Sequence, residues 1–123
     1  MSIALALAFV LSMPQDRPLT VADLTYSETY ACAALGVASQ QWVTEQLNGA
    51  TPSADEQKLL TALDGLANAA SLALDAAQAR EGLTPAQVDA AQNAALDDLG
   101  ETEDETLFAM TDLCGTIFGV NFD

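Results

Sequence analysis

The chain has 123 residues, of which 18 are acidic and three are basic, contains no histidine, and carries a formal net charge of −15. This length suits a single domain, and a chain that is half apolar is not of the disordered type. The charge argues against binding to nucleic acids or anionic membranes, because both attract Lys and Arg. Two interpretations of the charge remain: a surface that only keeps the chain soluble, or steered association with a basic partner protein.

The beginning of the chain has the pattern of a signal peptide. Residues 3–11 form an unbroken apolar run, which is too short for a membrane-spanning helix of about 20 residues but fits a signal core of about 7–15. Small-residue spacing over residues 10–12 offers a cleavage point before Met13, although no Lys or Arg precedes the run. We predict a signal peptide over residues 1–12 and a single helical domain over residues 13–123. The alternative is an apolar helix docked on the domain.

Four helices are predicted from their start and stop signals. A Ser or Thr followed three residues later by an acid or Gln marks each start, and a glycine lies near each end. The starts are Thr20-x-x-Asp23, Ser53-x-x-Glu56, Thr84-x-x-Gln87 and Thr102-x-x-Glu105, and the ends are Gly49, Gly82, Gly100 and Gly119. The helices then span residues 21–47, 54–80, 85–99 and 103–118. Because the connections are short, we predict an all-α fold, a small four-helix bundle with two long and two shorter antiparallel helices.

The first helix holds every Tyr and Trp of the chain. Cys32, Leu35 and Trp42 share one stripe, which predicts that Trp42 packs toward the core. Tyr26 and Tyr30 are one turn apart and would present one surface together. Aromatic anchors concentrate binding energy at interfaces, so Tyr26, Tyr30 and Trp42 are candidate interaction residues. The alternative is that they cover the core with their polar tips in water.

The second helix has an alanine-rich apolar stripe that predicts close packing. Its members are Leu60, Leu63, Ala67, Ala70, Leu74 and Ala77. Gly36 in the first helix and Gly65 in the second lie mid-helix, where glycine is about 1 kcal/mol less favourable than alanine. We expect tight helix–helix contact to compensate at both positions.

Residues 97–105 hold the densest cluster of carboxylates. Asp97 and Asp98 lie in the last turn of the third predicted helix, where the helix dipole disfavours negative charge. A Ca²⁺ ion, which takes six to eight oxygen ligands, would relieve this repulsion. The candidate ligands are Asp97, Asp98, Glu101, Glu103 and Asp104. The pattern of an EF-hand is absent, and a solvated acidic turn is the alternative.

The chain has two cysteines, Cys32 and Cys114, far apart and without a CxxC pattern. Both lie on apolar stripes, so a disulfide between the first and last helices is sterically reasonable. Two buried free thiols in a reducing compartment are the alternative. The signal-like start favours the disulfide, because such bonds persist in oxidising compartments.

No catalytic motif accompanies these elements. The chain lacks histidine, a GxSxG nucleophile motif and a glycine-rich phosphate loop, so we expect neither an enzyme nor a cofactor. We expect an exported acidic helical protein, periplasmic or secreted, that acts as an inhibitor, immunity or accessory factor on a basic protein partner. It would bind no nucleic acid and no membrane after signal cleavage. The alternatives are a carrier for a small apolar ligand held between the first two helices, a cation-binding protein or, without a signal peptide, a cytosolic DNA mimic.

Overall fold

The computed structural model describes residues 20–120 and Phe122. Within them, a short 3₁₀ helix is followed by four α-helices: η1 (Val21–Asp23), α2 (Tyr26–Leu47), α3 (Ala54–Glu81), α4 (Pro85–Gly100) and α5 (Asp104–Phe118). The predicted all-α fold and helical bundle are confirmed. The predicted signal peptide over residues 1–12 lies outside the described residues.

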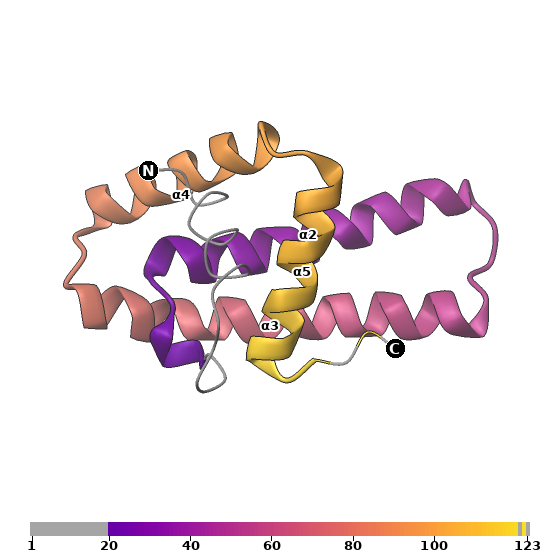
Figure 1. Cartoon of the computed structure of the whole chain (residues 1–123), viewed down its shortest axis with the longest axis horizontal. Coiled ribbons are helices and arrows are strands. Elements are labelled where there is room, and N and C mark those ends of the chain that lie inside the picture. Colours follow the sequence, from indigo (N-terminus) through magenta and orange to yellow (C-terminus); the bar gives the residue numbers. More distant parts are fainter. Residues whose placement is uncertain (1–19, 121, 123) are drawn as a thin grey trace.

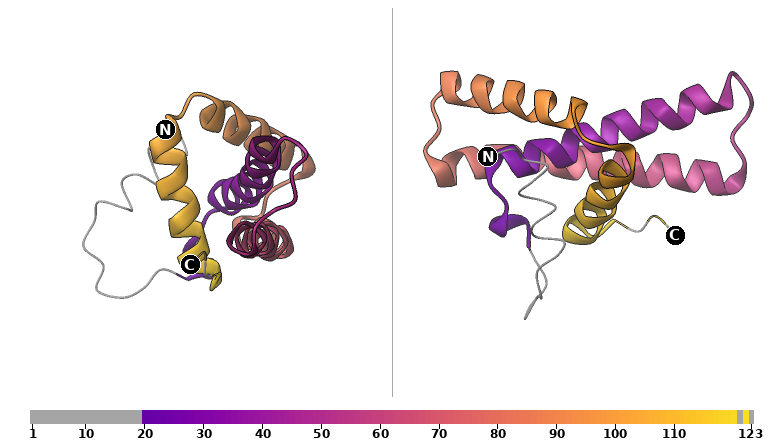
Figure 2. Two further views of the ribbon diagram at one scale, coloured as in Figure 1. Left: turned by 90° about the vertical axis from the view of Figure 1, so that its right-hand side faces the viewer. Right: turned by 45° about the horizontal axis from the view of Figure 1, so that its top comes forward.

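Helix α2 is the centre of the bundle. It contacts α3, α4 and α5, and its interface with α3 is the most extensive. Helices α2, α3 and α4 alternate in direction as predicted, but α5 crosses the others steeply (Figure 1). The end-on view of Figure 2 shows that α5 lies to one side of the other three helices and runs across their direction. The reason is that the buried side of α5 packs against the middle of α2 and α3 rather than along α4.

Two of the predicted helix starts are confirmed by their hydrogen bonds. The Ser53 hydroxyl accepts from the backbone N–H of Glu56 at 3.2 Å, and the Ser53 N–H donates to the Glu56 carboxylate at 2.9 Å. The hydrogen bond of the Glu56 carboxylate to the Ser53 backbone, and to a lesser extent its bond to the Ser53 side chain, holds the pKa of Glu56 below its ordinary value of 4.5. Thr84 caps α4 in the same way. Gly82 and Gly119 end α3 and α5 in the left-handed conformation that glycine adopts without strain.

The predicted start of the first helix is wrong. Thr20 begins only η1, and the extended backbone of Leu24 separates η1 from α2. The start of α2 is a second capping box, in which the Thr25 N–H donates to the Glu28 carboxylate at 2.8 Å and the Thr25 hydroxyl accepts from the Glu28 N–H at 3.1 Å. Two capping boxes thus follow each other within nine residues.

The predicted boundary between the last two helices is also wrong in detail. Glu103, not Thr102, occupies the N-cap of α5, because the Thr102 hydroxyl donates to the carbonyl of Asp98 at 2.6 Å. Gly100 stays helical and Glu101 follows as the C-cap of α4 in a right-handed conformation. At the end of α2, Asn48 takes the left-handed C-cap position and Gly49 follows it with a positive φ.

Gly36 lets α2 approach α3 closely. A Cβ atom on Gly36 would lie 2.9 Å from the backbone nitrogen of Ala67 and 3.1 Å from its Cβ, so only glycine fits. The same expectation for Gly65 is wrong, because nothing lies within 4 Å of the corresponding position. Small residues recur in the core: Ala31, Ala33, Ala67, Ala70, Ala77 and Ala95 are all buried.

The predicted disulfide joins Cys32 of α2 to Cys114 of α5. The two Cα atoms are 5.6 Å apart, both cysteines are fully buried, and the bond spans a sequence separation of 82. Leu35, Met110 and Ile117 belong to the same core cluster. The bond therefore lies inside the core, at the point where α5 crosses α2.

Substituting alanine at the two glycines should change stability in opposite directions. Gly36→Ala forces a methyl group into the Ala67 backbone, and we expect a loss of about 1–3 kcal/mol in the free energy of unfolding. Gly65→Ala meets nothing and should add up to about 1 kcal/mol, because alanine is the better helix former. Urea unfolding of both variants measures the two changes, and a stabilised Gly36→Ala variant would contradict the close approach of α2 and α3.

Removing either sulfur of the disulfide should have the same effect. We expect Cys32→Ala and Cys114→Ala each to lower the free energy of unfolding by about 2–5 kcal/mol, since a crosslink of this span stabilises by about 4–5 kcal/mol in chain-entropy models. The double variant should be no worse than either single variant, because both open the same loop. Losses that add up would mean that the two cysteines act independently.

Candidate functional site

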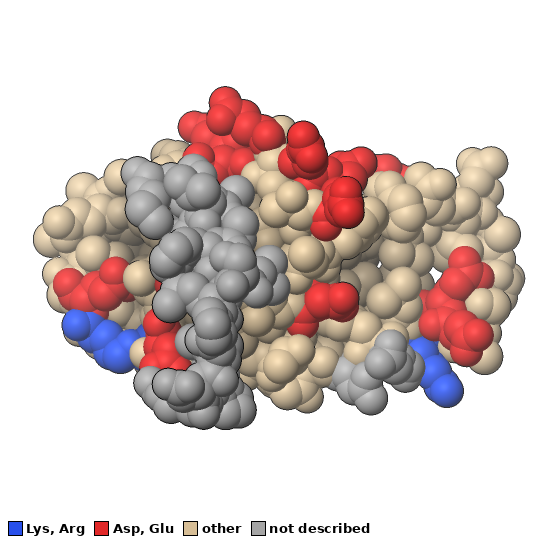
Figure 3. All heavy atoms as spheres, viewed as in Figure 1, with Lys and Arg blue, Asp and Glu red and all other residues tan. Residues whose placement is uncertain are grey.

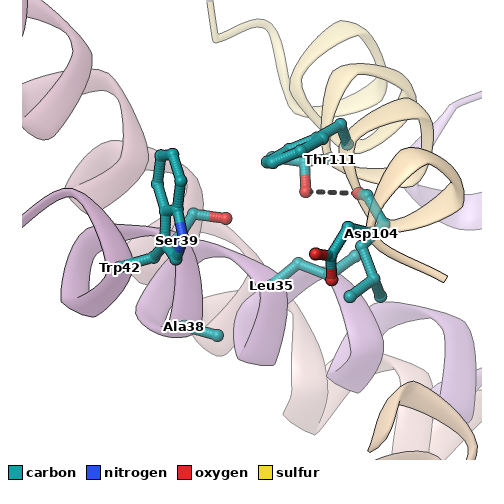
Figure 4. Close-up of a pocket in the computed structure, with 8 residues that line it drawn as sticks. Leu35, Ala38, Ser39, Trp42, Asp104 and Thr111 are labelled. Atoms are coloured by element: carbon teal, nitrogen blue, oxygen red, sulfur yellow. Dashed lines mark hydrogen bonds between the residues drawn. The ribbon is translucent and has the colours of Figure 1, made fainter. Parts of the chain in front are cut away.

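A groove opens where the C-terminal half of α2 diverges from the first half of α5. It has a volume of about 300 Å³ and is lined by Leu35, Ala38, Ser39, Trp42, Asp104, Leu107, Phe108 and Thr111. Figure 4 shows Trp42 on one side of the groove, α5 on the other and Leu35 between them. Its volume is at the lower end of the range of about 300–1,000 Å³ that is usual for ligand pockets.

The spacing of the lining residues explains the shape of the groove. On α2 they lie three, six, seven and ten residues after Cys32, and on α5 they lie three, six, seven and ten residues before Cys114. These offsets follow one face of each helix for almost three turns from the disulfide. The groove is therefore the wedge between two helices that are joined at Cys32–Cys114 and diverge from it.

Two half-exposed aromatic rings dominate this wedge. The rings of Trp42 and Phe108 meet edge to face, with centroids 6.0 Å apart and an interplanar angle of 69°. Trp42 is 51% exposed and Phe108 is 56% exposed, so the prediction that Trp42 packs into the core is wrong. An antiparallel α5 would run along α2, whereas the steeply crossing α5 buries Leu35 and leaves Trp42, two turns further on, half-exposed.

The same two rings also line a second, smaller hollow. It has a volume of about 170 Å³ and extends toward α3 and the end of the chain. Ser39, Trp42, Phe108 and Thr111 are common to both hollows, and Val43, Leu59, Leu63, Asp112 and Phe122 complete the second one. Trp42 and Phe108 thus form the centre of a larger apolar surface.

The polar groups that line the groove and the second hollow are few, and those that carry a charge are acidic. The Thr111 hydroxyl uses its proton within α5, since it donates to the carbonyl of Leu107 at 2.8 Å. The Asp104 carboxylate and the Ser39 hydroxyl are directed toward the space between the helices (Figure 4). Asp112 lines the second hollow, and the lining residues of both hollows include no Lys or Arg. The surface is apolar with a negative edge.

The two tyrosines have a structural role. Tyr26 is only 3% exposed, and its hydroxyl accepts a hydrogen bond from Nε2 of Gln92 at 2.9 Å. Its backbone N–H donates to the Glu81 carboxylate, and its ring stacks on Tyr30 with centroids 6.5 Å apart. Tyr30 is half-buried and packs on the core. Tyr26 therefore holds the start of α2 against α3 and α4, and its side chain is buried within this chain.

The acidic turn lies between α4 and α5. Asp97 and Asp98 are in the last turn of α4, and Glu101, Glu103 and Asp104 follow around the turn. Among the described residues, no group of three or more Cys, Asp or Glu side chains is arranged to hold a metal ion. Asp104 belongs instead to the lining of the groove.

The comparisons with known proteins add no relative. No family model, no curated protein and no solved structure matches this chain. No helix within residues 20–120 is long and apolar enough to cross a membrane. The functional argument therefore rests on the geometry and chemistry of the groove.

Neutralising the end of α4 tests the acidic turn. Asp97→Asn removes a negative charge from the C-terminal end of a helix, so we expect the free energy of unfolding to rise by about 0.3–1 kcal/mol in the presence of a chelator. The same gain should appear with millimolar Ca²⁺, and calcium should leave the wild-type melting temperature unchanged. A calcium-dependent rise of the wild-type melting temperature that Asp97→Asn abolishes would instead reveal a cation site.

Proposed function

We propose that this chain is an exported, non-catalytic binding protein whose α2–α5 groove accepts a basic segment of a partner protein. The observation that supports this most directly is the Trp42–Phe108 pair, two large aromatic side chains that are half-exposed beside a preformed groove. Residues of this kind are among those that contribute most of the energy in protein interfaces. A contiguous exposed apolar surface indicates an interaction site, whereas single exposed apolar residues are common on any protein.

The charge of the chain supports a basic partner. Acidic side chains outnumber basic ones sixfold in the sequence. Figure 3 shows Asp and Glu side chains gathered where α4 ends and α5 begins. A potential of one sign attracts a partner of the opposite sign and raises the association rate, with a strong dependence on salt. Asp104 and Asp112 bring this negative charge to the edge of the aromatic surface.

A location outside the cytosol is part of this proposal. The buried Cys32–Cys114 disulfide suits an oxidising compartment, and residues 1–12 have the composition of a signal peptide. An inhibitor, immunity or accessory role in the periplasm or outside the cell agrees with both features.

A carrier for a small apolar ligand is the competing function. It was expected to hold the ligand between the first two helices, but Gly36 and Ala67 are in direct contact in that seam. The α2–α5 groove would be the place for such a ligand. Native mass spectrometry of the purified protein distinguishes the two functions, because a retained small molecule adds a defined mass and a binding protein for basic segments retains none.

Truncating the aromatic pair should weaken partner binding strongly. We expect a partner recovered from the exported fraction at low salt to bind the purified wild-type protein. The Trp42→Ala, Phe108→Ala double variant should bind the same partner about tenfold or more weakly, which is the usual scale for hot-spot residues. Both side chains are half-exposed, so the variant should keep its fold, which its melting temperature checks.

The matched control is Leu72→Ala on α3. Leu72 is 83% exposed and lines neither hollow, so its truncation removes an exposed apolar side chain without touching the groove. Isothermal titration calorimetry at two salt concentrations gives the affinities and the electrostatic contribution. Equal affinity of wild type and the Trp42, Phe108 double variant for the partner would reject the proposed function.

A further inference from the structure

We infer that the side chain which the groove accepts from its partner is an arginine, held between the Trp42 ring and the Asp104 carboxylate. This inference rests on the proposed function and names the chemistry that the groove would recognise. It is carried by the combination of an apolar floor, an aromatic wall and a carboxylate at the rim of one hollow.

The groove suits a side chain with an apolar stem and a charged end. Leu35 and Ala38 would contact the stem at the floor of the groove, and the Trp42–Phe108 pair would contact it as one wall. A purely apolar side chain would remove water from the Asp104 carboxylate without replacing its hydrogen bonds, which is unfavourable. Arginine and lysine both bury their methylene groups on apolar surface while the charge stays at the edge.

The carboxylate of Asp104 is available for such a charge. Within the described residues it has no hydrogen-bond or ion-pair partner, and it is exposed at the first position of α5. The positive end of the α5 dipole corresponds to about half an elementary charge, and Glu103, Asp104 and Glu105 together exceed it. The opening of the groove therefore has a net negative charge.

Arginine fits these groups better than lysine. Its planar guanidinium stacks on an aromatic face, and tryptophan is the most favourable ring for this contact. The same group offers a fork of N–H donors to a carboxylate, whereas the lysine ammonium is a compact and strongly hydrated point charge. A groove with an indole on one side and a carboxylate on the other uses both properties of arginine at once.

The inference is tested with minimal probes of the side chain. Butylguanidinium represents arginine, butylammonium represents lysine, and butylurea has the shape of the arginine probe without its charge. Trp42 is the only tryptophan of the chain, so its indole N–H gives a single resolved signal in a nitrogen–proton NMR spectrum. Titration of the oxidised protein with each probe follows that signal to saturation.

We expect butylguanidinium to shift the indole signal saturably and to bind about tenfold or more tightly than butylurea and more tightly than butylammonium. Asp104→Asn should lower the affinity for butylguanidinium by about fivefold or more and leave the affinity for butylurea unchanged. Glu105→Gln is the matched control, because it removes one charge from the same turn but lines neither hollow. Its effect should stay below about twofold.

Three results would overturn the arginine assignment: no saturable shift, equal binding of butylurea and butylguanidinium, or tighter binding of butylammonium. Equal losses in Asp104→Asn and Glu105→Gln would also overturn it, since the attraction would then come from the general potential and not from a contact. These results do not test the proposed function. That function is tested separately, by comparing partner binding of the wild type with that of the Trp42→Ala, Phe108→Ala variant. The two failures are therefore distinguishable.

Discussion

The bond between Cys32 and Cys114 determines where α5 lies on α2, with Cα atoms 5.6 Å apart. Helices that cross steeply touch over a short length and diverge on both sides of the contact. On the side where α2 continues toward Trp42 and α5 begins at Asp104, this divergence is the groove. The position of both aromatic rings and of the rim carboxylate thus depends on one covalent bond in the core.

The composition of the core explains why that bond is needed. Six of the sixteen buried apolar residues described are alanines, which bury little area each and contribute correspondingly little to stability. Small residues bring α2 and α3 close together, as the Gly36–Ala67 contact shows. They do not by themselves hold a fourth helix at a fixed position, and small domains with little core commonly add a disulfide for this purpose.

Local signals in the sequence predicted the helices, and tertiary geometry accounts for what they missed. The capping boxes at Ser53 and Thr84 depend only on residues within one turn, and both are confirmed. The predicted helix start at Thr102 was wrong because the Thr102 hydroxyl donates to the carbonyl of Asp98 instead of capping α5. A spacing pattern does not show which of these two hydrogen bonds a Thr side chain makes. The disulfide was predictable, since both cysteines lay on apolar stripes.

The groove itself was not predictable in this way. Trp42 follows Leu35 by two helical turns on the same face, but only the crossing direction of α5 decides which of the two is covered. Phe108 left a signal in the sequence, because it falls beside the stripe of Leu107, Met110 and Cys114 and not on it. A large aromatic residue outside the apolar stripe of a short helix indicates exposure, and this observation alone could have directed attention to α5.

The charge of the chain also decides which occupant the aromatic surface favours. A second copy of this protein would bring another net charge of −15 to an interface whose edge already holds Asp104 and Asp112. Like charges placed together at an interface disfavour association, and a high net charge keeps copies apart. An uncharged apolar ligand would gain nothing from the carboxylates and would lie against two half-exposed rings, in contact with water. A basic segment gains from contact with the rings and from attraction to the negative charge. Added salt would weaken the binding of such a segment, whereas it would strengthen self-association by screening the repulsion between copies.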